Sequence, residues 1–294
     1  MTDLLAALRG RMLLGDGAMG TELQARGLEV GECLELWNVE HADVVESIHR
    51  DYVEAGADLV LTNSFGATSF KLSKFGFEGR VGELNEAAAR VARAAAGAER
   101  IVLGDVGPTG ELMAPLGLHD ADAFEAAFAK QIEALVRGGV DGIILETMTA
   151  IEEVEAAVKA ARSVTDMPVL TSMQFKRDAD GVSLHTMMGV DVPSYAKRAL
   201  EWGVEVVGGN CSTPEELLDV VRLLKETVEV PVFAEPNAGV PELIGGKTVF
   251  KLGPVEYADA VAGLVEAGVS LLGGCCGTTP EHIRVLAERL GREA

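Results

Sequence analysis

The chain has 294 residues, of which 48% are hydrophobic, and its 46 acidic and 25 basic residues give a formal net charge of −21. This acidity argues against binding to nucleic acids or anionic membranes, because no basic block is present to neutralise phosphates. The charged amino terminus does not resemble a signal peptide, and no apolar run approaches the roughly 20 residues that a membrane helix needs. With four cysteines and no signal, we expect a cytoplasmic protein whose thiols bind metal or react rather than cross-link.

Along the chain, short apolar runs alternate with longer amphipathic stretches, a pattern that predicts strands followed by helices. Eight strands are predicted, at residues 12–15, 59–62, 101–104, 142–145, 168–172, 205–208, 230–234 and 270–273. The predicted helices include residues 42–55, 82–96, 122–137, 151–164, 192–202, 214–227, 254–267 and 280–290. Several of these helices end at a glycine, such as Gly56, Gly139 or Gly268, where a helix C-cap favours positive φ.

Eight strand–helix units without a long linker predict a single (βα)8 barrel of the TIM type, a single domain spanning residues 1–294. An open, doubly wound sheet is the structural alternative. In a barrel, functional side chains belong at the carboxyl ends of the strands. Polar or thiol side chains follow all eight predicted strands, and they include Asp16, Asn63, Asp105, Glu146, Gln174, Asn210, Cys211, Glu235, Asn237, Cys275 and Cys276.

Three of the four cysteines lie at the ends of predicted strands. Cys275 and Cys276 stand in the run GGCCG at 273–277, and Cys211 ends the similar run GGNC at 208–211. Adjacent cysteines do not readily form a disulfide with each other, whereas the glycines permit a turn that lets both bind one ion. Buried structural thiols are the alternative, but the repetition favours a shared metal site, and sulfur ligands favour zinc. Cys33 has no such spacing and is interpreted as incidental.

Six motifs together resemble the zinc-dependent homocysteine S-methyltransferases, most closely the homocysteine-binding domain of cobalamin-dependent methionine synthases. The motifs are GDGAMGT at 15–21, LTNSFGAT at 61–68, GDVGPTG at 104–110, GNC at 209–211, EPNAG at 235–239 and GGCCGT at 273–278. The likeness runs from about residue 13 to about residue 290. It implies an enzyme that transfers a methyl group to the thiol of homocysteine, forming methionine, with zinc held by Cys211, Cys275 and Cys276.

The resemblance also implies where the amino-acid part of homocysteine binds. Asp16 and Glu146 match the family positions that hold the substrate ammonium, and they are the predicted catalytic residues. A turn residue at Asp16 and a paired strand-end acid at Glu146 are the structural alternatives. The predicted partners of the substrate carboxylate are the backbone amides around Ser64, Phe65, Gly66 and Ala67.

Two asparagines stand beside these residues in the family pattern. By analogy, Asn237 could occupy the fourth position of the zinc ion until homocysteine displaces it, while Asn210 could orient a ligand. Either could instead stabilise its loop. Three thiolates make zinc a poor generator of hydroxide, so the predicted chemistry is activation of an incoming thiol.

The methyl donor is left open by these motifs. The betaine-using branch of the family typically carries an aromatic residue where this chain has Thr147, and aromatic residues make up only 5% of the chain, which argues against betaine. Cobalamin-dependent methionine synthases continue into folate, cobalamin and reactivation modules, whereas this sequence stops at Ala294. We therefore expect a small donor such as S-methylmethionine or S-adenosylmethionine, or else a separate methyl-corrinoid or folate protein.

Two other functions stay open at this point. One is a homocysteine-binding subunit that is inactive without a separate methyl-corrinoid or folate-binding partner. The other is a barrel lyase or aldolase with a Schiff-base lysine. It is disfavoured because no lysine falls at a predicted strand end, the nearest being Lys176, beyond Gln174 and Phe175.

Overall fold

The computed structural model describes residues 3–245 and 247–292, and eight parallel strands form its centre. The strands are β1 (Leu13–Leu14), β2 (Leu59–Leu61), β3 (Ile101–Val106), β4 (Gly142–Met148), β5 (Val169–Met173), β8 (Val206–Asn210), β9 (Val232–Glu235) and β12 (Leu271–Leu272). Their order in the sheet is β1-β12-β9-β8-β5-β4-β3-β2, so chain neighbours are sheet neighbours and the first strand lies beside the last. The predicted domain range 1–294 also includes residues 1, 2, 246, 293 and 294, which lie outside the described part.

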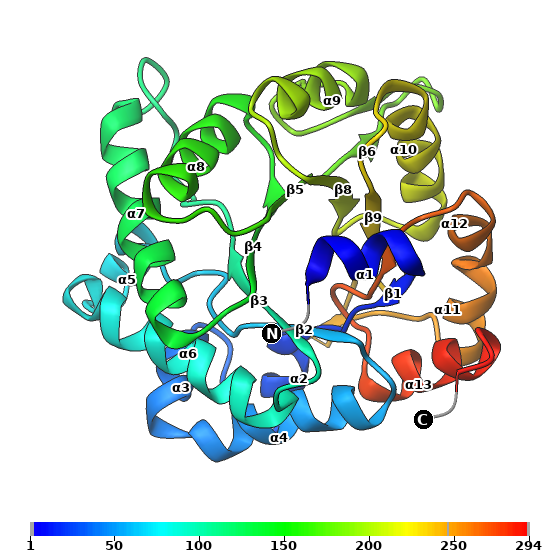
Figure 1. The fold of residues 1–294 in the computed structure, drawn as a ribbon, viewed down its shortest axis with the longest axis horizontal. Helices are drawn as coiled ribbons and strands as arrows, with labels where there is room; N and C mark the ends of the chain where they lie inside the picture. The colour runs from blue at the N-terminus through cyan, green and yellow to red at the C-terminus, as the bar shows by residue number, and fades with distance from the viewer. Residues whose placement is uncertain (1–2, 246, 293–294) are drawn as a thin grey trace.

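Helices surround this sheet and alternate with its strands, as Figure 1 shows in a view along the barrel. They include α4 (Ala42–Glu54), α6 (Val81–Ala96), α7 (Ala121–Gly138), α8 (Ile151–Val164), α9 (Val192–Glu201), α10 (Pro214–Thr227), α11 (Pro254–Ala260), α12 (Ala262–Glu266) and α13 (Pro280–Arg289). The predicted TIM barrel is thus confirmed, and every predicted strand overlaps an observed one.

One predicted helix, at 254–267, is two helices in the structure. α11 and α12 meet at Val261, which caps both of them. Gly263 lies in α12, where a Cβ atom would come within 3.1 Å of Leu218 on α10. Glycine allows this close approach but weakens the helix, so packing takes precedence over helical continuity here.

The barrel closes between β1 and β2 through a small number of hydrogen bonds. The main-chain N–H of Asp58 donates to the Leu14 carbonyl at 2.7 Å. The carboxylate of Asp58 accepts from the N–H of Leu14 at 2.8 Å, and that of Asp16 accepts from the N–H of Leu61 at 2.9 Å. Two side-chain carboxylates therefore complete the ring where the main-chain ladder is thin.

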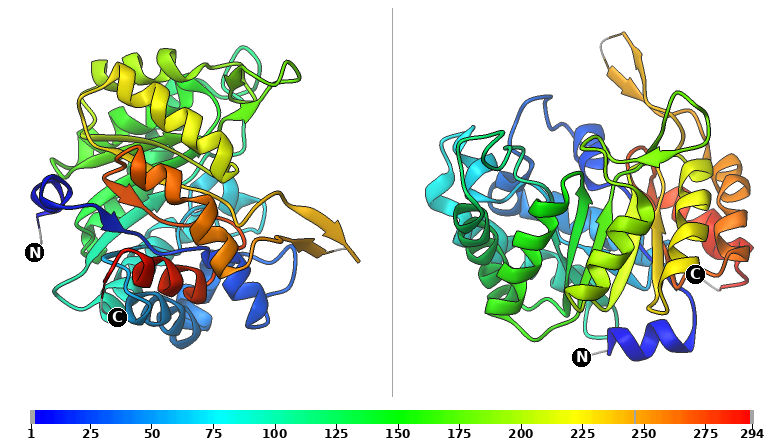
Figure 2. Two further views of the ribbon diagram at one scale, coloured as in Figure 1. Left: turned by 90° about the vertical axis from the view of Figure 1, so that its right-hand side faces the viewer. Right: turned by 90° about the horizontal axis from the view of Figure 1, so that it is seen from above.

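The barrel interior is filled at its amino-terminal end. Leu4 and Leu8 of α1 (Leu4–Gly10) are buried against apolar side chains from inside the barrel, namely Leu13, Leu59, Ile101, Leu103, Ile144, Leu170, Val206, Phe233 and Leu271. Figure 2 shows α1 at one end of the barrel and two hairpins projecting from the other. Only the carboxyl-terminal end of the strands is therefore left for a cavity.

Several short elements that were not predicted lie in the loops that follow the strands. They are α2 (Met19–Ala25), α3 (Trp37–Glu40), α5 (Ser69–Ser73) and the hairpins β6–β7 (Lys176–Arg177, Leu184–His185) and β10–β11 (Glu242–Ile244, Lys247–Val249). None of the described helices combines the length and the apolar character needed to cross a membrane.

Candidate functional site

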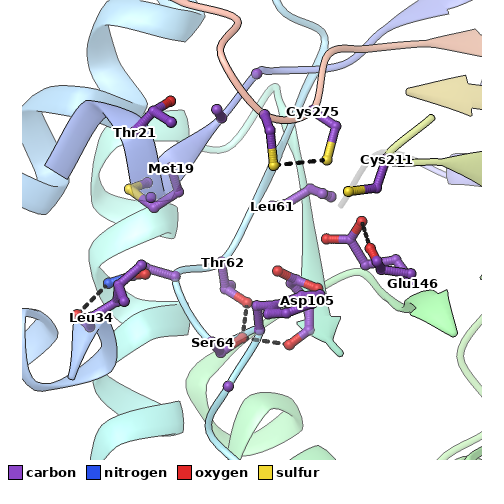
Figure 3. Close-up of a pocket in the computed structure, with 18 of the residues that line it drawn as sticks. Met19, Thr21, Leu34, Leu61, Thr62, Ser64, Asp105, Glu146, Cys211 and Cys275 are labelled. Atoms are coloured by element: carbon purple, nitrogen blue, oxygen red, sulfur yellow. Dashed lines mark hydrogen bonds between the residues drawn. The ribbon is translucent and has the colours of Figure 1, made fainter. Parts of the chain in front are cut away.

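Three cysteine sulfurs meet at the carboxyl ends of β8 and β12, the two strands that flank β9 in the barrel. Cys211 directly follows β8, and Cys275 and Cys276 follow β12 after two glycines. The three Sγ atoms all lie within 4.8 Å of one another, and those of Cys275 and Cys276 are 4.0 Å apart. Figure 3 shows the sulfurs of Cys211 and Cys275 pointing toward each other at the edge of the cavity. This is the convergence that the sequence predicted.

Main-chain hydrogen bonds join the loop after β12, which carries Cys275 and Cys276, to the loop after β9. The N–H of Cys275 donates to Pro236 at 2.8 Å, and the carbonyl of Cys276 accepts from Ala238 at 2.9 Å. Asn237 lies between them on the loop after β9, and its side chain hydrogen-bonds to Cys211. Its Oδ1 atom is buried and has no hydrogen-bond partner among the described residues. An unpartnered amide oxygen beside three sulfurs fits a fourth metal ligand.

The thiols perturb one another strongly. Hydrogen bonds from Cys275 and Cys276 lower the pKa of Cys211 to about 3, and their bonds to Cys211 raise the pKa of Cys275 and bring that of Cys276 to about 12. The three side chains alone thus favour one thiolate and two thiols. A divalent cation would allow all three to ionise, since metal coordination deprotonates a thiol. The donor set therefore fits a thiolate-bound metal ion.

Four buried carboxyl groups lie next to the sulfurs and line the same cavity of about 550 Å³: Asp16, Asp105, Glu146 and Glu235. Burial raises the pKa of all four, that of Glu146 to about 7. Asp105 and Glu146 also share a hydrogen bond, which requires that the pair retain a proton. Such a cluster suits a cationic ligand group.

Asn210 orients the Glu146 carboxylate. Its Nδ2 atom donates to Glu146 and to the Thr147 hydroxyl. Its Oδ1 atom accepts from the Thr147 N–H at 2.9 Å and from the Ser172 hydroxyl at 2.8 Å. These bonds leave the amide a single orientation, so the carboxylate is held in place by β5 and β8 as well as by its own strand.

Most of the backbone amides that were predicted to bind the substrate carboxylate already donate hydrogen bonds within the protein. Ser64 donates to Thr62, Ala67 donates to Ser64, and Gly66 donates to the Glu35 carboxylate at 2.7 Å. Phe65 is the member of this loop whose N–H has no acceptor within the described part of the chain. Ser64, Phe65 and Gly66 line the cavity, whereas Ala67 is fully buried outside it.

Asp105, Glu235 and Lys71 line the cavity but were not predicted as site residues. Asp105 and Glu235 lie at the carboxyl ends of strands, so their place in the predicted barrel could have marked them as site residues. Lys71 lies on α5, which was not predicted, and no motif marks it. Asn237 contacts Cys211 but is not among the residues that line the cavity.

Comparisons with known proteins agree with this geometry. Two methionine synthases, from Mycobacterium leprae and Mycobacterium tuberculosis, are each 35% identical to this chain over 99% and 97% of its length. The chain spans only 25% of the length of either relative. The likeness therefore covers nearly the whole of this chain but only a quarter of each relative.

Solved structures extend the likeness to the fold. The metallated form of the homocysteine methyltransferase MmuM from Escherichia coli superposes with a TM-score of 0.79 at 27% identity, covering 98% of this chain and all of that one. A methyltransferase from Methanosarcina mazei, 13% identical with a TM-score of 0.59, shares the fold. The family model described as homocysteine S-methyltransferase matches residues 13–290. Since this match covers nearly the whole chain, the protein belongs to the homocysteine S-methyltransferase family.

Proposed function

We propose that residues 1–294 form a single homocysteine-binding barrel that transfers a methyl group to the homocysteine thiol, producing methionine, with zinc as its cofactor. The observation that carries this proposal is the meeting of three cysteine sulfurs, within 4.8 Å of one another, with a buried carboxyl cluster in one cavity. The sulfurs suit a thiol-binding zinc ion, and the carboxyl groups suit the ammonium of an amino acid.

Cys211, Cys275 and Cys276 would hold the ion, with Asn237 as the ligand that an incoming thiol replaces. When bound, zinc supplies the ionisation of the substrate thiol, whose ordinary pKa of about 8.5 leaves only a small fraction as thiolate at neutral pH. Since the three remaining ligands would all be thiolates, the substrate sulfur would stay electron-rich and nucleophilic.

Asp16 and Glu146 act on the other end of the substrate. Their carboxyl groups are 3% and 8% exposed, so an ammonium between them exchanges water for charge-assisted hydrogen bonds. Asn210 keeps Glu146 in place, and the Leu61 N–H keeps Asp16 in place. Fixing the ammonium aligns the sulfur for displacement, in which one S–C bond forms and the methyl–donor bond breaks.

Substitution of the cysteines tests the proposal. The Cys275→Ala and Cys276→Ala variants should lose both the bound metal, expected at about one zinc per chain in the wild type, and homocysteine methylation. The matched control is Cys33→Ala, whose buried thiol bonds to Glu35 away from the metal cluster and whose loss should leave zinc content unchanged. Metal analysis by mass spectrometry and methionine formation are measured on the same samples. Methylation by protein without bound metal would contradict the proposal.

A second candidate is a subunit that binds homocysteine but depends on a separate methyl-corrinoid or folate-binding protein. One observation favours it: large apolar side chains are exposed at the end of the barrel that holds the cavity, as on surfaces that contact another protein. Among these are Leu116, Leu118, Val240 and Leu243, which are 69%, 96%, 62% and 79% exposed.

A donor panel separates the two candidates. The zinc-loaded chain is assayed with S-methylmethionine, S-adenosylmethionine, betaine, methyltetrahydrofolate and methylcobalamin. Rapid turnover with any free donor rejects the dependent subunit. Homocysteine binding without turnover on the whole panel supports it.

A further inference from the structure

Lys71 is the one basic residue among those lining the cavity in the described chain, and five carboxyl groups line it as well, from Asp16, Glu35, Asp105, Glu146 and Glu235. It lies on α5, in the loop region between β2 and α6. A cavity with this charge pattern attracts cations at most of its surface. Lys71 is therefore the place where an anionic group can bind.

The ammonium of Lys71 has no anionic contact within the described residues. No carboxylate oxygen of the described residues lies within ion-pair distance of Lys71. Its Nζ atom lies over the face of the Phe65 ring, 4.5 Å from the ring centroid. Burial lowers the pKa of Lys71, while Glu35, Asp105 and Glu153 counteract this from a distance. A mostly buried cation without a partner is costly, so an anion from the ligand would stabilise it.

The neighbouring acids are already used by other donors. Glu35 accepts from the Gly66 N–H at 2.7 Å, and Glu153 accepts from the N–H and hydroxyl of Thr109 at 2.8 and 2.7 Å. Lys74, on the next turn, differs because it forms an ion pair with Glu111 at 3.2 Å. Lys71 is thus kept free while a lysine three residues away is paired.

We propose that Lys71 binds the α-carboxylate of the amino-acid substrate and makes the cavity selective for a zwitterion over a simple aminothiol. The inference rests on the proposed function. An α-amino acid carries its ammonium and carboxylate on one carbon, so both charges need partners in one small space. The carboxyl cluster serves the first. Lys71 serves the second together with the free N–H of Phe65, because the amides of Ser64, Gly66 and Ala67 already donate within the described chain.

The test compares two thiols that differ only in the carboxylate. Homocysteine and 3-aminopropane-1-thiol are titrated calorimetrically into the zinc-loaded full chain without a methyl donor. Lys71→Met should raise the Kd for homocysteine by about 30-fold or more, the loss expected for a charge-assisted bond in a cavity. Its Kd for the aminothiol should stay the same or fall, since a positive charge is removed near an ammonium site.

Two further variants serve as controls. Lys71→Arg keeps the charge and should retain part of the homocysteine affinity. Lys74→Met, which removes the paired surface lysine, should change neither Kd. Aminothiol binding by Lys71→Met also shows that the variant is folded.

Three results would overturn the inference. If Lys71→Met raises the Kd of homocysteine and of the aminothiol equally, Lys71 has a structural role. If the Kd of homocysteine is unchanged, Lys71 has no role in binding homocysteine, even where the variant alters the use of the methyl donor. Both leave the proposed function intact. A wild-type zinc-loaded chain that binds neither thiol would overturn the proposed function together with this inference.

Discussion

Two residues beside the cavity hold backbone conformations that non-glycine residues rarely adopt. Thr147 has φ of 59° and Cys211 has φ of 55°. A β-branched or bulky residue in this region costs on the order of 1–3 kcal/mol and persists only where neighbours enforce it. Asn210 enforces it at Thr147, because it accepts from the Thr147 N–H and donates to the hydroxyl. The strain therefore coincides with the residues that orient Glu146.

Replacing Asn210 by alanine should weaken homocysteine binding by about tenfold, because Glu146 loses the amide that holds its carboxylate. The free energy of unfolding should fall by about 1–2 kcal/mol, since the Thr147 N–H loses its acceptor. Calorimetric titration and urea unfolding measure the two effects. Ser172→Ala, which removes only a hydroxyl that donates to Asn210, should show a smaller change in both. An Asn210→Ala variant that binds homocysteine with wild-type affinity would show that Asn210 does not position Glu146 for binding.

At the scale of elements, the weak point of the barrel is the seam between β1 and β2. Asp58 bridges it by accepting from the Leu14 N–H and by pairing with Arg11 at 2.7 Å and with Arg292. These contacts join the seam to a residue before β1 and to one after α13. Burial alone would raise the pKa of Asp58, but the bonds from Arg11 and Leu14 and the charge of Arg292 lower it.

Asp58→Asn should lower the free energy of unfolding at pH 7 by about 2–3 kcal/mol, because Arg11, Arg100 and Arg292 lose a carboxylate partner at a mostly buried site. The folded-state pKa lies below the unfolded value, so this stabilisation is full above that value and is lost as the pH falls through the folded pKa. Urea unfolding is measured at pH 7 and at a pH below about 4. The difference in the free energy of unfolding between Asp58→Asn and wild type should be smaller at the lower pH.

The control for this seam prediction is Asp259→Asn, which breaks an exposed pair with Arg289 and should leave the free energy of unfolding nearly unchanged. A difference between Asp58→Asn and wild type that persists unchanged in acid would show that the charge of Asp58 is not what stabilises the seam.

At the scale of the whole molecule, the two ends of the barrel differ in polarity. One end is sealed by α1 and apolar side chains, while the other collects buried acids whose charges repel one another. Asp105 illustrates this, since its Oδ1 atom is buried and has no partner within the described chain. Its main chain is held by Thr62 and Ser64 through hydrogen bonds of 2.9 and 2.6 Å, which fix the backbone position from which the carboxyl group lines the cavity. The arrangement lowers the stability of the fold but suits a cationic ligand group.

Asp105→Asn should therefore stabilise the metal-free protein, increasingly as the pH rises. Burial first, and then the charges of Glu146, Glu235 and Asp16, raise the folded pKa of Asp105, while Lys71 opposes them. A raised acid pKa means that the folded state binds more protons, so stability is highest below the unfolded value of 3.8 and falls as the pH rises. The variant removes this loss.

Urea unfolding at pH 5 and pH 8 measures the effect, and the gain of Asp105→Asn over wild type should be larger at pH 8. Homocysteine affinity should fall in the same variant, because a carboxylate next to the ammonium site is lost. A gain that is the same at both values would show that Asp105 is already neutral or already fully charged throughout this range.

Much of the fold followed from local patterns. Apolar runs mark the strands, and polar residues with capping side chains mark the helix starts, as where the Thr213 side chain accepts from the Glu216 N–H at the start of α10. The barrel order then brings the ends of β8 and β12 near the strand between them, so the meeting of Cys211, Cys275 and Cys276 was predictable. The roles of these residues and of Asp16 and Glu146 remain predictions until the variants are measured.

The eight strand–helix units, the family and the cysteine cluster could be inferred from the amino-acid sequence alone, because periodicity and motif spacing are properties of short segments. Three other features became visible only in the folded chain: Asp58 closes the barrel, the loop amides of Ser64, Gly66 and Ala67 are occupied, and Lys71 lines the cavity without an anionic partner in the described chain. Each of these depends on which groups from distant segments have found donors or acceptors. That is settled by the packing of the whole chain, and no short segment encodes it.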